Sequence, residues 1–195
     1  MLGGYPSVLF ARGELQAGLS MARTGLALVD ISVAADSERN VAMWGACFAT
    51  QMGLPEEAIK HSDRNMAAAR RTRSRYRELN GYVMGRSSIW DAIGDFDALL
   101  EDARAASELV PGNVVRLGGY VKLAVAAVNA EFERGNREEG QRRFEETVEF
   151  IRSGDDKYQT LLASPRLAHI ARLAGDVEHL DFAKEMLDRV DASNY

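Results

Sequence analysis

Five dipeptides decide the fold of this sequence: Gly13-Glu14, Gly53-Leu54, Gly94-Asp95, Gly135-Asn136 and Gly175-Asp176. Their glycines are 40, 41, 41 and 40 residues apart, and each lies between two segments whose apolar residues recur at helical spacing. The chain therefore reads as one helix-turn-helix unit repeated five times. This regularity predicts an architecture and points to no particular reaction.

The recurrence of glycine at these turns has a stereochemical reason. A helix is commonly ended by a residue in the left-handed conformation, which glycine adopts without a steric cost. The next helix prefers Asp, Asn or Glu near its first turn, as in Gly94-Asp95 and Gly135-Asn136. Gly53-Leu54-Pro55-Glu56-Glu57 instead places proline at the first helical position, followed by two acids. We therefore expect a left-handed glycine at each turn.

The helical periodicity predicts ten helices arranged in five hairpins. The expected helices are 1–12 and 15–30, 38–52 and 56–73, 76–93 and 96–110, 114–134 and 137–152, and 158–174 and 177–190. The first segment holds about half a helix when compared with the later units. The chain is therefore expected to be a single domain over 1–195 and a fragment of a longer array or multidomain protein.

Alignment of the units on their glycines predicts a shared packing plan. Five residues after the glycine stand Gly18, Ala58, Leu99, Gly140 and Leu180, and nine residues after it stand Ala22, Ser62, Ala103, Phe144 and Lys184. Small side chains at these positions let the two helices of a hairpin approach closely. The larger residues of the last unit indicate an atypical end unit.

The composition limits the compartment and the class of partner. The single cysteine, Cys47, excludes an internal disulfide framework and a Cys-rich zinc site, which favours a reducing, cytoplasmic location. No apolar run approaches the ~20 residues that span a bilayer. The formal net charge of -5 gives no global attraction to nucleic acid or to anionic lipid.

Residues 80–111 resemble a tetratricopeptide repeat. They have the length of that repeat, with Gly94-Asp95 at the turn between helices, Ala103 and Ala106 at packing positions, and Pro111 at the end. The sequence departs from the family at Ser87, where glycine is usual, and at Leu99, where alanine is usual. The resemblance implies an all-α fold, an α-α superhelix or tetratricopeptide-like solenoid.

The whole chain is also similar to longer-period arrays of bacterial regulators, namely LuxR-type and STAND activators, bacterial transcriptional activator domains and class III adenylate cyclases. The unit most like theirs runs from Met43-Trp44-Gly45 through Gly53-Leu54-Pro55-Glu56-Glu57-Ala58 to Ala67-Ala68-Ala69-Arg70. This resemblance implies a protein-interaction or ligand-sensing scaffold in signal transduction or transcription regulation. It transfers no catalytic residue.

A concave surface is expected where the first helices of stacked hairpins lie side by side. Positions six and three residues before each glycine would face it, forming a mixed polar and aromatic groove for a protein or peptide partner or a small-molecule effector. The candidate groove residues are Cys47, Thr50, Ser88, Asp91, Asn129, Phe132, His169 and Arg172. The alternative is that these positions are ordinary contacts between helices or solvated residues.

Six arginines occur within fourteen residues, from Arg64 to Arg77. The candidate basic patch is Arg70, Arg71, Arg73, Arg75 and Arg77. Arginine forks bind phosphates and carboxylates, so nucleic acid or an acidic protein partner are the alternatives that this cluster raises. The competing interpretation is a solvated helix end whose arginines pair with acids such as Asp63, Glu78, Asp95 and Asp97. The acidic net charge and the lack of a recognition-helix signature disfavour nucleic acid, and homodimerisation stays open.

The sequence provides no catalytic constellation. It contains no phosphate-binding loop, no dinucleotide-binding glycine motif, no nucleophile elbow and no Cys-x-x-Cys pair. An active site from Cys47, Ser88 and His169 would draw on three different units, about 10 Å apart per step by helix-packing distances. We therefore predict a non-enzymatic protein with no metal and no cofactor.

Overall fold

The computed structural model of the protein describes residues 5–29, 35–109, 120–153, 166–170, 172, 175, 180, 181, 184, 185 and 188. None of these residues lies in a β-strand. The elements are α1 (Tyr5–Ala11), α2 (Leu15–Leu28), α3 (Ala35–Gln51), α4 (Pro55–Arg71), α5 (Arg75–Gly81), the π-helix η1 (Tyr82–Arg86), α6 (Ser87–Ile93), α7 (Phe96–Leu109), α8 (Tyr120–Glu133) and α9 (Arg137–Ser153). Residues 166–170 are also helical.

The all-α prediction is confirmed, and the described helices lie where the periodicity placed them. The start of the expected 114–134 helix lies outside the described residues, as do much of 158–174 and 177–190. One segment differs from the expectation of a regular helix over 76–93, because η1 interrupts it. There the N–H of Ser87 donates to the carbonyl of Tyr82 and closes a wide turn.

The five turn glycines are all left-handed, as predicted. Their φ angles lie between 67 and 79°. At four of the turns, the residue after the glycine donates its N–H over 2.9 Å to the carbonyl five residues earlier: Glu14 to Leu9, Leu54 to Ala49, Asp95 to Trp90 and Asn136 to Glu131. This is the Schellman bond that closes a helix C-terminus. Glu14 and Leu54 form no side-chain cap, so at these two turns the second residue contributes through its backbone.

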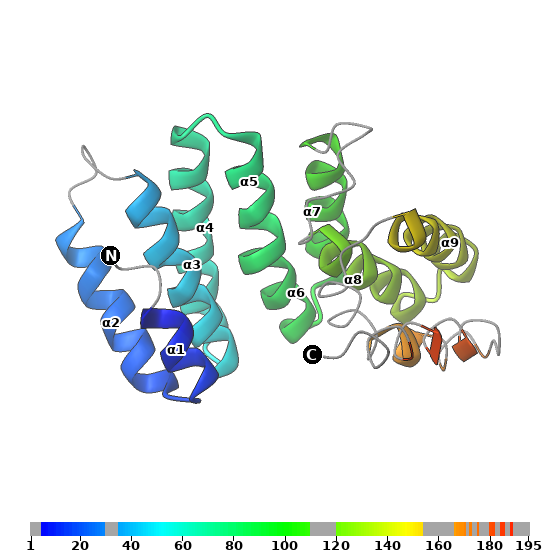
Figure 1. Ribbon diagram of the computed structural model, residues 1–195, viewed down its shortest axis with the longest axis horizontal. Helices are drawn as coiled ribbons and strands as arrows, with labels where there is room; N and C mark the ends of the chain where they lie inside the picture. The colour runs from blue at the N-terminus through cyan, green and yellow to red at the C-terminus, as the bar shows by residue number, and fades with distance from the viewer. Residues whose placement is uncertain are drawn as a thin grey trace. The chain divides into compact units, whose positions relative to one another are not determined.

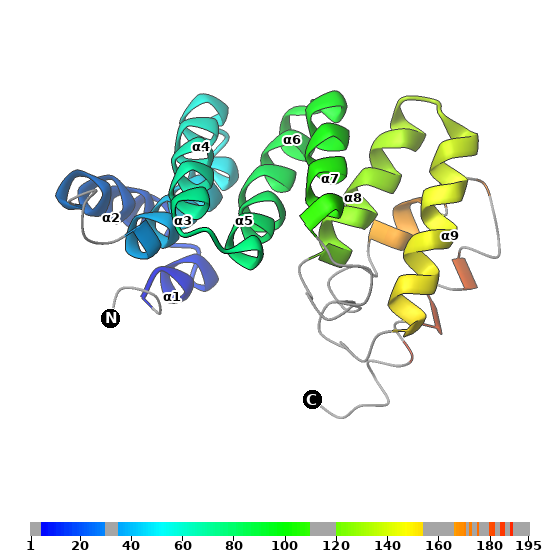
Figure 2. The ribbon, with the colours of Figure 1, turned by 90° about the horizontal axis from the view of Figure 1, so that it is seen from above.

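The chain forms two compact units, 1–95 and 96–195. In the first unit α2 packs on α3, α3 on α4, and α4 on the helix formed by α5, η1 and α6 (Figure 1). In the second unit α7 packs on α8, and α8 packs on α9 across the Gly135 turn (Figure 2). The core of the second unit contains Val121, Val125, Val128, Phe144, Val148, Ile151, Leu167 and Ile170. That 1–195 forms one domain stays a prediction.

The predicted packing plan is present in four units. Both aligned positions are buried in those units: Gly18, Ala58, Leu99 and Gly140, and Ala22, Ser62, Ala103 and Phe144. In the last unit Leu180 and Lys184 are exposed. Gly140 shows the expected close approach within a hairpin, because a Cβ built there would lie 3.1 Å from the ring of Phe132 on α8. Gly18 instead permits a close approach between hairpins, because a Cβ built there would lie 2.2 Å from the fully buried ring of Phe48 on α3.

Replacing Gly18 with alanine tests this close approach. Helix propensity alone predicts that Gly18→Ala stabilises the protein by about 1 kcal/mol. We expect destabilisation of about 1–3 kcal/mol instead, because the added methyl group overpacks the contact with Phe48. Urea unfolding followed by circular dichroism measures the change. Ser20→Ala, at an exposed position of the same helix, is the control and should stay within about 0.5 kcal/mol of wild type.

Candidate functional site

In the first unit, the four candidate groove residues are half-buried on α3 and α6. The Sγ of Cys47 donates to the carbonyl of Met84 in η1 at 3.5 Å. The hydroxyl of Thr50 donates to the carbonyl of Ala46 at 2.8 Å, within its own helix. Ser88 and Asp91 lie on α6, which packs against α3. The structure therefore brings these residues to neighbouring helices, and the contacts of Cys47 and Thr50 are structural ones.

In the second unit, the other four candidate groove residues differ in exposure. Asn129 is buried, Phe132 is half-buried, and His169 and Arg172 are exposed. The Phe132 ring covers Gly140, where a Cβ would lie 3.1 Å away. His169 Nε2 lies 3.7 Å from a carboxylate oxygen of Glu133. None of the eight candidates lines either of the two hollows described below, so their role in binding stays a prediction.

Three of the six arginines of the cluster pair with acids of the first turn of α3. Glu38 is only 2% exposed and accepts from Arg64 at 2.6 Å and from Arg71. Arg64 also donates to the carbonyl of Leu26 at 3.0 Å, so this group joins α2, α3 and α4. Asp36 accepts from Arg77 at 2.7 Å. Arg70 donates to Glu78 of α5 at 2.9 Å. Four of the six arginines therefore have partners on other helices.

Sequence reasoning identified only part of this pairing. Glu78 was expected as a partner and binds Arg70. Asp63 instead pairs with Arg86 at 2.8 Å, outside the cluster. Asp97 pairs with Arg134 at 2.7 Å in the second unit. Asp36 and Glu38 were missed because they precede the cluster by more than twenty residues, and only the packing of α3 on α4, η1 and α6 brings them close to the arginines.

A hollow of about 550 Å³ lies between α2 and α4. Arg23 of α2 donates to both carboxylate oxygens of Glu57 on α4, at 2.7 and 2.6 Å. This hydrogen bonding lowers the pKa of Glu57. His61 Nε2 lies 3.4 Å from the same carboxylate, but burial dominates and lowers the pKa of the imidazole from 6.5. Arg23 and Glu57 in this hollow are therefore already paired with each other, and Arg64 is paired with Glu38.

A second hollow, the α7–α9 groove, has a volume of about 430 Å³. It is lined by Ala103, Arg104 and Ser107 of α7, by Tyr120, Leu123, Ala124 and Ala127 of α8, and by Arg142, Arg143, Glu146, Thr147 and Phe150 of α9. The rings of Tyr120 and Phe150 meet edge to face, with centroids 5.5 Å apart. Burial raises the pKa of the Tyr120 hydroxyl, so Tyr120 is a neutral hydrogen-bonding group beside an apolar floor.

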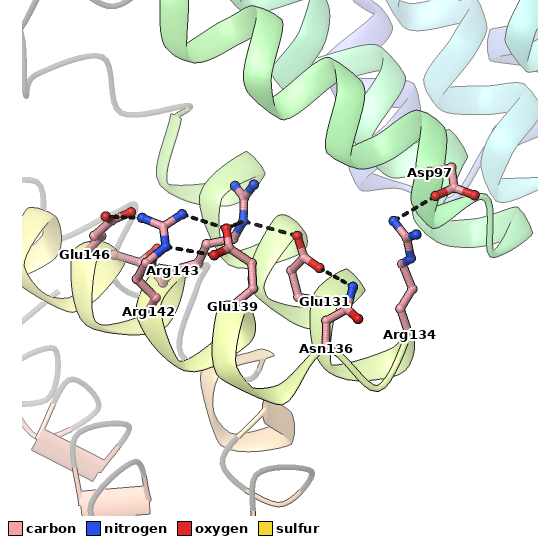
Figure 3. A network of polar contacts seen from close by, with 9 residues as sticks. Asp97, Glu131, Arg134, Asn136, Glu139, Arg142, Arg143 and Glu146 are labelled. Carbon is pink, nitrogen blue, oxygen red and sulfur yellow. Dashed lines mark hydrogen bonds and ion pairs between the residues drawn. The ribbon is translucent and has the colours of Figure 1, made fainter.

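Ion pairs fix the arginines of α9 beside this groove (Figure 3). Arg142 donates to both oxygens of Glu139, at 2.8 and 2.6 Å, and also to Glu146. Arg143 Nε lies 2.9 Å from Glu139 and 3.3 Å from the buried carboxylate of Glu131. The amide of Asn136 donates to Glu131 at 3.0 Å. These pairs pre-orient the guanidinium groups, which limits the side-chain entropy that a ligand would have to remove.

The α7–α9 groove differs from the surface predicted from the sequence. The predicted surface is formed by the first helices of the hairpins, whereas most of the residues lining the groove belong to the second helices α7 and α9. The signal in the sequence was weak, namely Arg142-Arg143 followed by Glu146-Thr147 and Phe150 at helical spacing on one face. Among the described residues there is no group of three His, Cys, Asp or Glu that could hold a metal ion, and no helix long and apolar enough to cross a membrane.

The buried Glu38 carboxylate is expected to stabilise the first unit far more than its exposed neighbour Asp36. Glu38→Ala leaves Arg64 and Arg71 without their carboxylate and opens a polar gap, so we expect a loss of about 2–3 kcal/mol. Asp36→Ala removes surface pairs from the same helical turn and should cost at most about 1 kcal/mol. Urea unfolding measures both changes. Equal losses of stability in the two variants would contradict the larger stabilising contribution assigned to Glu38.

Protonation of His61 is expected to make stability depend on pH. Because burial lowers the pKa of His61 in the folded protein, the unfolded chain binds the proton more readily. The free energy of unfolding should therefore fall as the pH drops below about 6.5, the ordinary histidine value. His61→Gln should flatten this dependence between about pH 7 and pH 5 in urea unfolding. A slope in His61→Gln equal to that of wild type would refute the assignment.

Comparison with known proteins supports the fold. No protein-family model matches the sequence, and no curated protein matches it. The structure is similar to the crystal structure of nearly identical TPR-like repeats from a Podosopora anserina protein described as a kinesin light chain, with a TM-score of 0.67 and 14% sequence identity. The likeness covers 96% of this chain and 90% of that chain. At this identity the similarity is one of fold, and it confirms a tetratricopeptide-like helical repeat architecture.

Proposed function

We propose that this protein is a non-catalytic protein-interaction module and that the α7–α9 groove binds a segment of its partner. The observation that carries the proposal is the composition of the groove, in which an aromatic pair and pre-oriented arginines surround small apolar side chains. Tyrosine and arginine are the residue types that most often dominate binding energy at protein interfaces. A helical repeat array suits this role because it presents side chains at fixed intervals on a rigid frame.

The chemistry of the groove favours an amphipathic peptide segment as the ligand. Ala103, Leu123 and Ala127 are buried and form an apolar floor. Arg142 and Arg143 are already bound by Glu139, so they do not require an anion to neutralise them. A segment with apolar side chains for the floor and backbone carbonyls for the arginine N–H groups would satisfy both kinds of surface. A small-molecule effector in the same groove is the alternative.

The similarity of the sequence to arrays of bacterial regulators supports a finer proposal. In those regulators the array receives a signal or a partner and passes the result to a neighbouring ATPase, cyclase or DNA-binding part. We propose the same receiving role here, in the cytoplasm, with residues 1–195 acting as one domain. The residues expected to face the concave surface are proposed as further contact positions in each unit, namely Cys47, Thr50, Ser88 and Asp91 in the first and Asn129, Phe132, His169 and Arg172 in the second.

Site-specific photo-crosslinking tests the groove. A benzoylphenylalanine at Ser107, an exposed residue of the groove wall, is expected to capture a partner segment that mass spectrometry identifies. The same probe at Glu101, exposed on α7 and outside the groove lining, is the control. The captured segment, resynthesised as a peptide, should bind the protein in isothermal titration calorimetry, and Ser107→Trp should weaken its binding at least about tenfold by filling the groove.

The matched variant Glu101→Trp should bind the peptide as wild type does. Equal crosslinking from both positions, or peptide binding unchanged by Ser107→Trp, would reject the groove as the binding site. Binding of a metabolite without any peptide would favour the small-molecule alternative. Concentration-dependent self-association in light scattering, lost in Ser107→Trp, would identify the partner segment as part of a second copy.

A further inference from the structure

The α4–α5 turn is defined here as residues 72–76, the connection 72–74 and the first two residues of α5, and its conformation is unlike that of the five glycine turns. Arg73 has a φ of 53° and is the only left-handed residue other than glycine in the described part of the chain. Its N–H donates to the carbonyl of Arg70 at 3.0 Å. Thr72 Oγ1 donates to Ala69 at 2.6 Å, and Ser74 Oγ accepts from the N–H of Arg77 at 3.4 Å. An arginine is thus held in a conformation that glycine would adopt at lower steric cost.

Three side chains of this turn face solvent. Arg73 and Arg75 are exposed, and no described residue forms an ion pair with either. Tyr76 is 59% exposed, which is high for an aromatic residue. Neighbouring arginines behave differently, since Arg71 and Arg77 are bound by the carboxylates of α3. The tip of the turn therefore displays two arginines and a tyrosine, the combination enriched at interface hot spots.

The surroundings of the turn carry a strong local excess of positive charge. Seven arginines gather there: Arg39, Arg64, Arg70, Arg71, Arg73, Arg75 and Arg77. They share three carboxylates, Asp36, Glu38 and Glu78, so four positive charges are left over. This excess occurs on a chain with a net charge of -5. The electrostatic potential around the turn is therefore positive although the net charge of the whole chain is negative, which favours a negatively charged partner at this point.

We infer that the α4–α5 turn is a docking point for an acidic segment of a partner protein, whose carboxylates pair with Arg73 and Arg75 and whose apolar side chains contact Tyr76. Nucleic acid fits less well. Tight binding to a nucleic acid rests on many phosphate contacts along a backbone, whereas this segment between two hairpins has only two arginines without an ion pair to a described residue. The inference is independent of the α7–α9 groove, because the turn belongs to the other compact unit.

A fluorescent acidic decapeptide that combines Glu and Asp with two leucines serves as the probe, and the same peptide with Gln and Asn in place of the acids is its control. At low salt the acidic peptide should bind wild type and weaken as salt is raised. Arg73→Glu plus Arg75→Glu should weaken binding at least about tenfold. Arg12→Glu plus Arg137→Glu makes the same change in net charge at exposed positions elsewhere and should leave binding within about twofold of wild type.

Arg73→Gly separates binding from folding. A purely structural arginine would lower the melting temperature when it is removed, whereas glycine at this left-handed position should preserve or raise the melting temperature while peptide binding weakens. Binding that is absent in wild type up to about 1 mM, or equal for the acidic and amide peptides, overturns the inference. If a single-stranded 20-mer oligonucleotide binds more tightly than the peptide, and the double variant loses that binding, the inference is overturned in favour of nucleic acid. Ser107→Trp should leave this binding intact, which keeps the result distinct from a failure of the groove.

Discussion

The structure depends on a single backbone constraint, the left-handed glycine that ends the first helix of each hairpin. A positive φ reverses the chain within two or three residues, so the following helix starts beside the one that has just ended. The same backbone bond closes four of these turns at the same length, which gives the hairpins a common geometry. The packing of α3 on α4 and of α8 on α9 follows from that geometry.

The hairpins are then held by contacts that differ between the two units. In the first unit, a buried carboxylate on α3 gathers arginines from α4, and a glycine on α2 admits a phenylalanine from α3. In the second unit, the arginines of α9 are fixed by acids of α8 and α9 beside the α7–α9 groove. A repeated backbone therefore supports non-repeated surfaces, and those surfaces are the parts available for recognition.

The distinction between local and non-local interactions explains what the sequence could predict. The turns at Gly13 and Gly53 are predictable because glycine adopts the left-handed conformation without a steric cost, and the small residues Gly18 and Ala58 follow these glycines at the same offset. The partners of Glu38 could not be found in this way, because their proximity depends on how α3 crosses α4. The α7–α9 groove was missed for the same reason, since it exists only where three helices meet. The sequence also showed the cluster from Arg70 to Arg77 without showing which arginines are neutralised.

The π-helix η1 places a wide turn inside a helical segment, between two of the turn glycines. The interval from Gly53 to Gly94 is one residue longer than the interval from Gly13 to Gly53, and it contains a turn that closes over five residues instead of four. One additional residue in a helical turn rotates the side chains that follow it by about 100° around the helix axis, relative to a regular helix. An alignment that treats residues 75–93 as an uninterrupted α-helix would thus assign the residues before η1 to the wrong face. In this interval the wider turn lies inside a helix, where a comparison of loop lengths would not detect it.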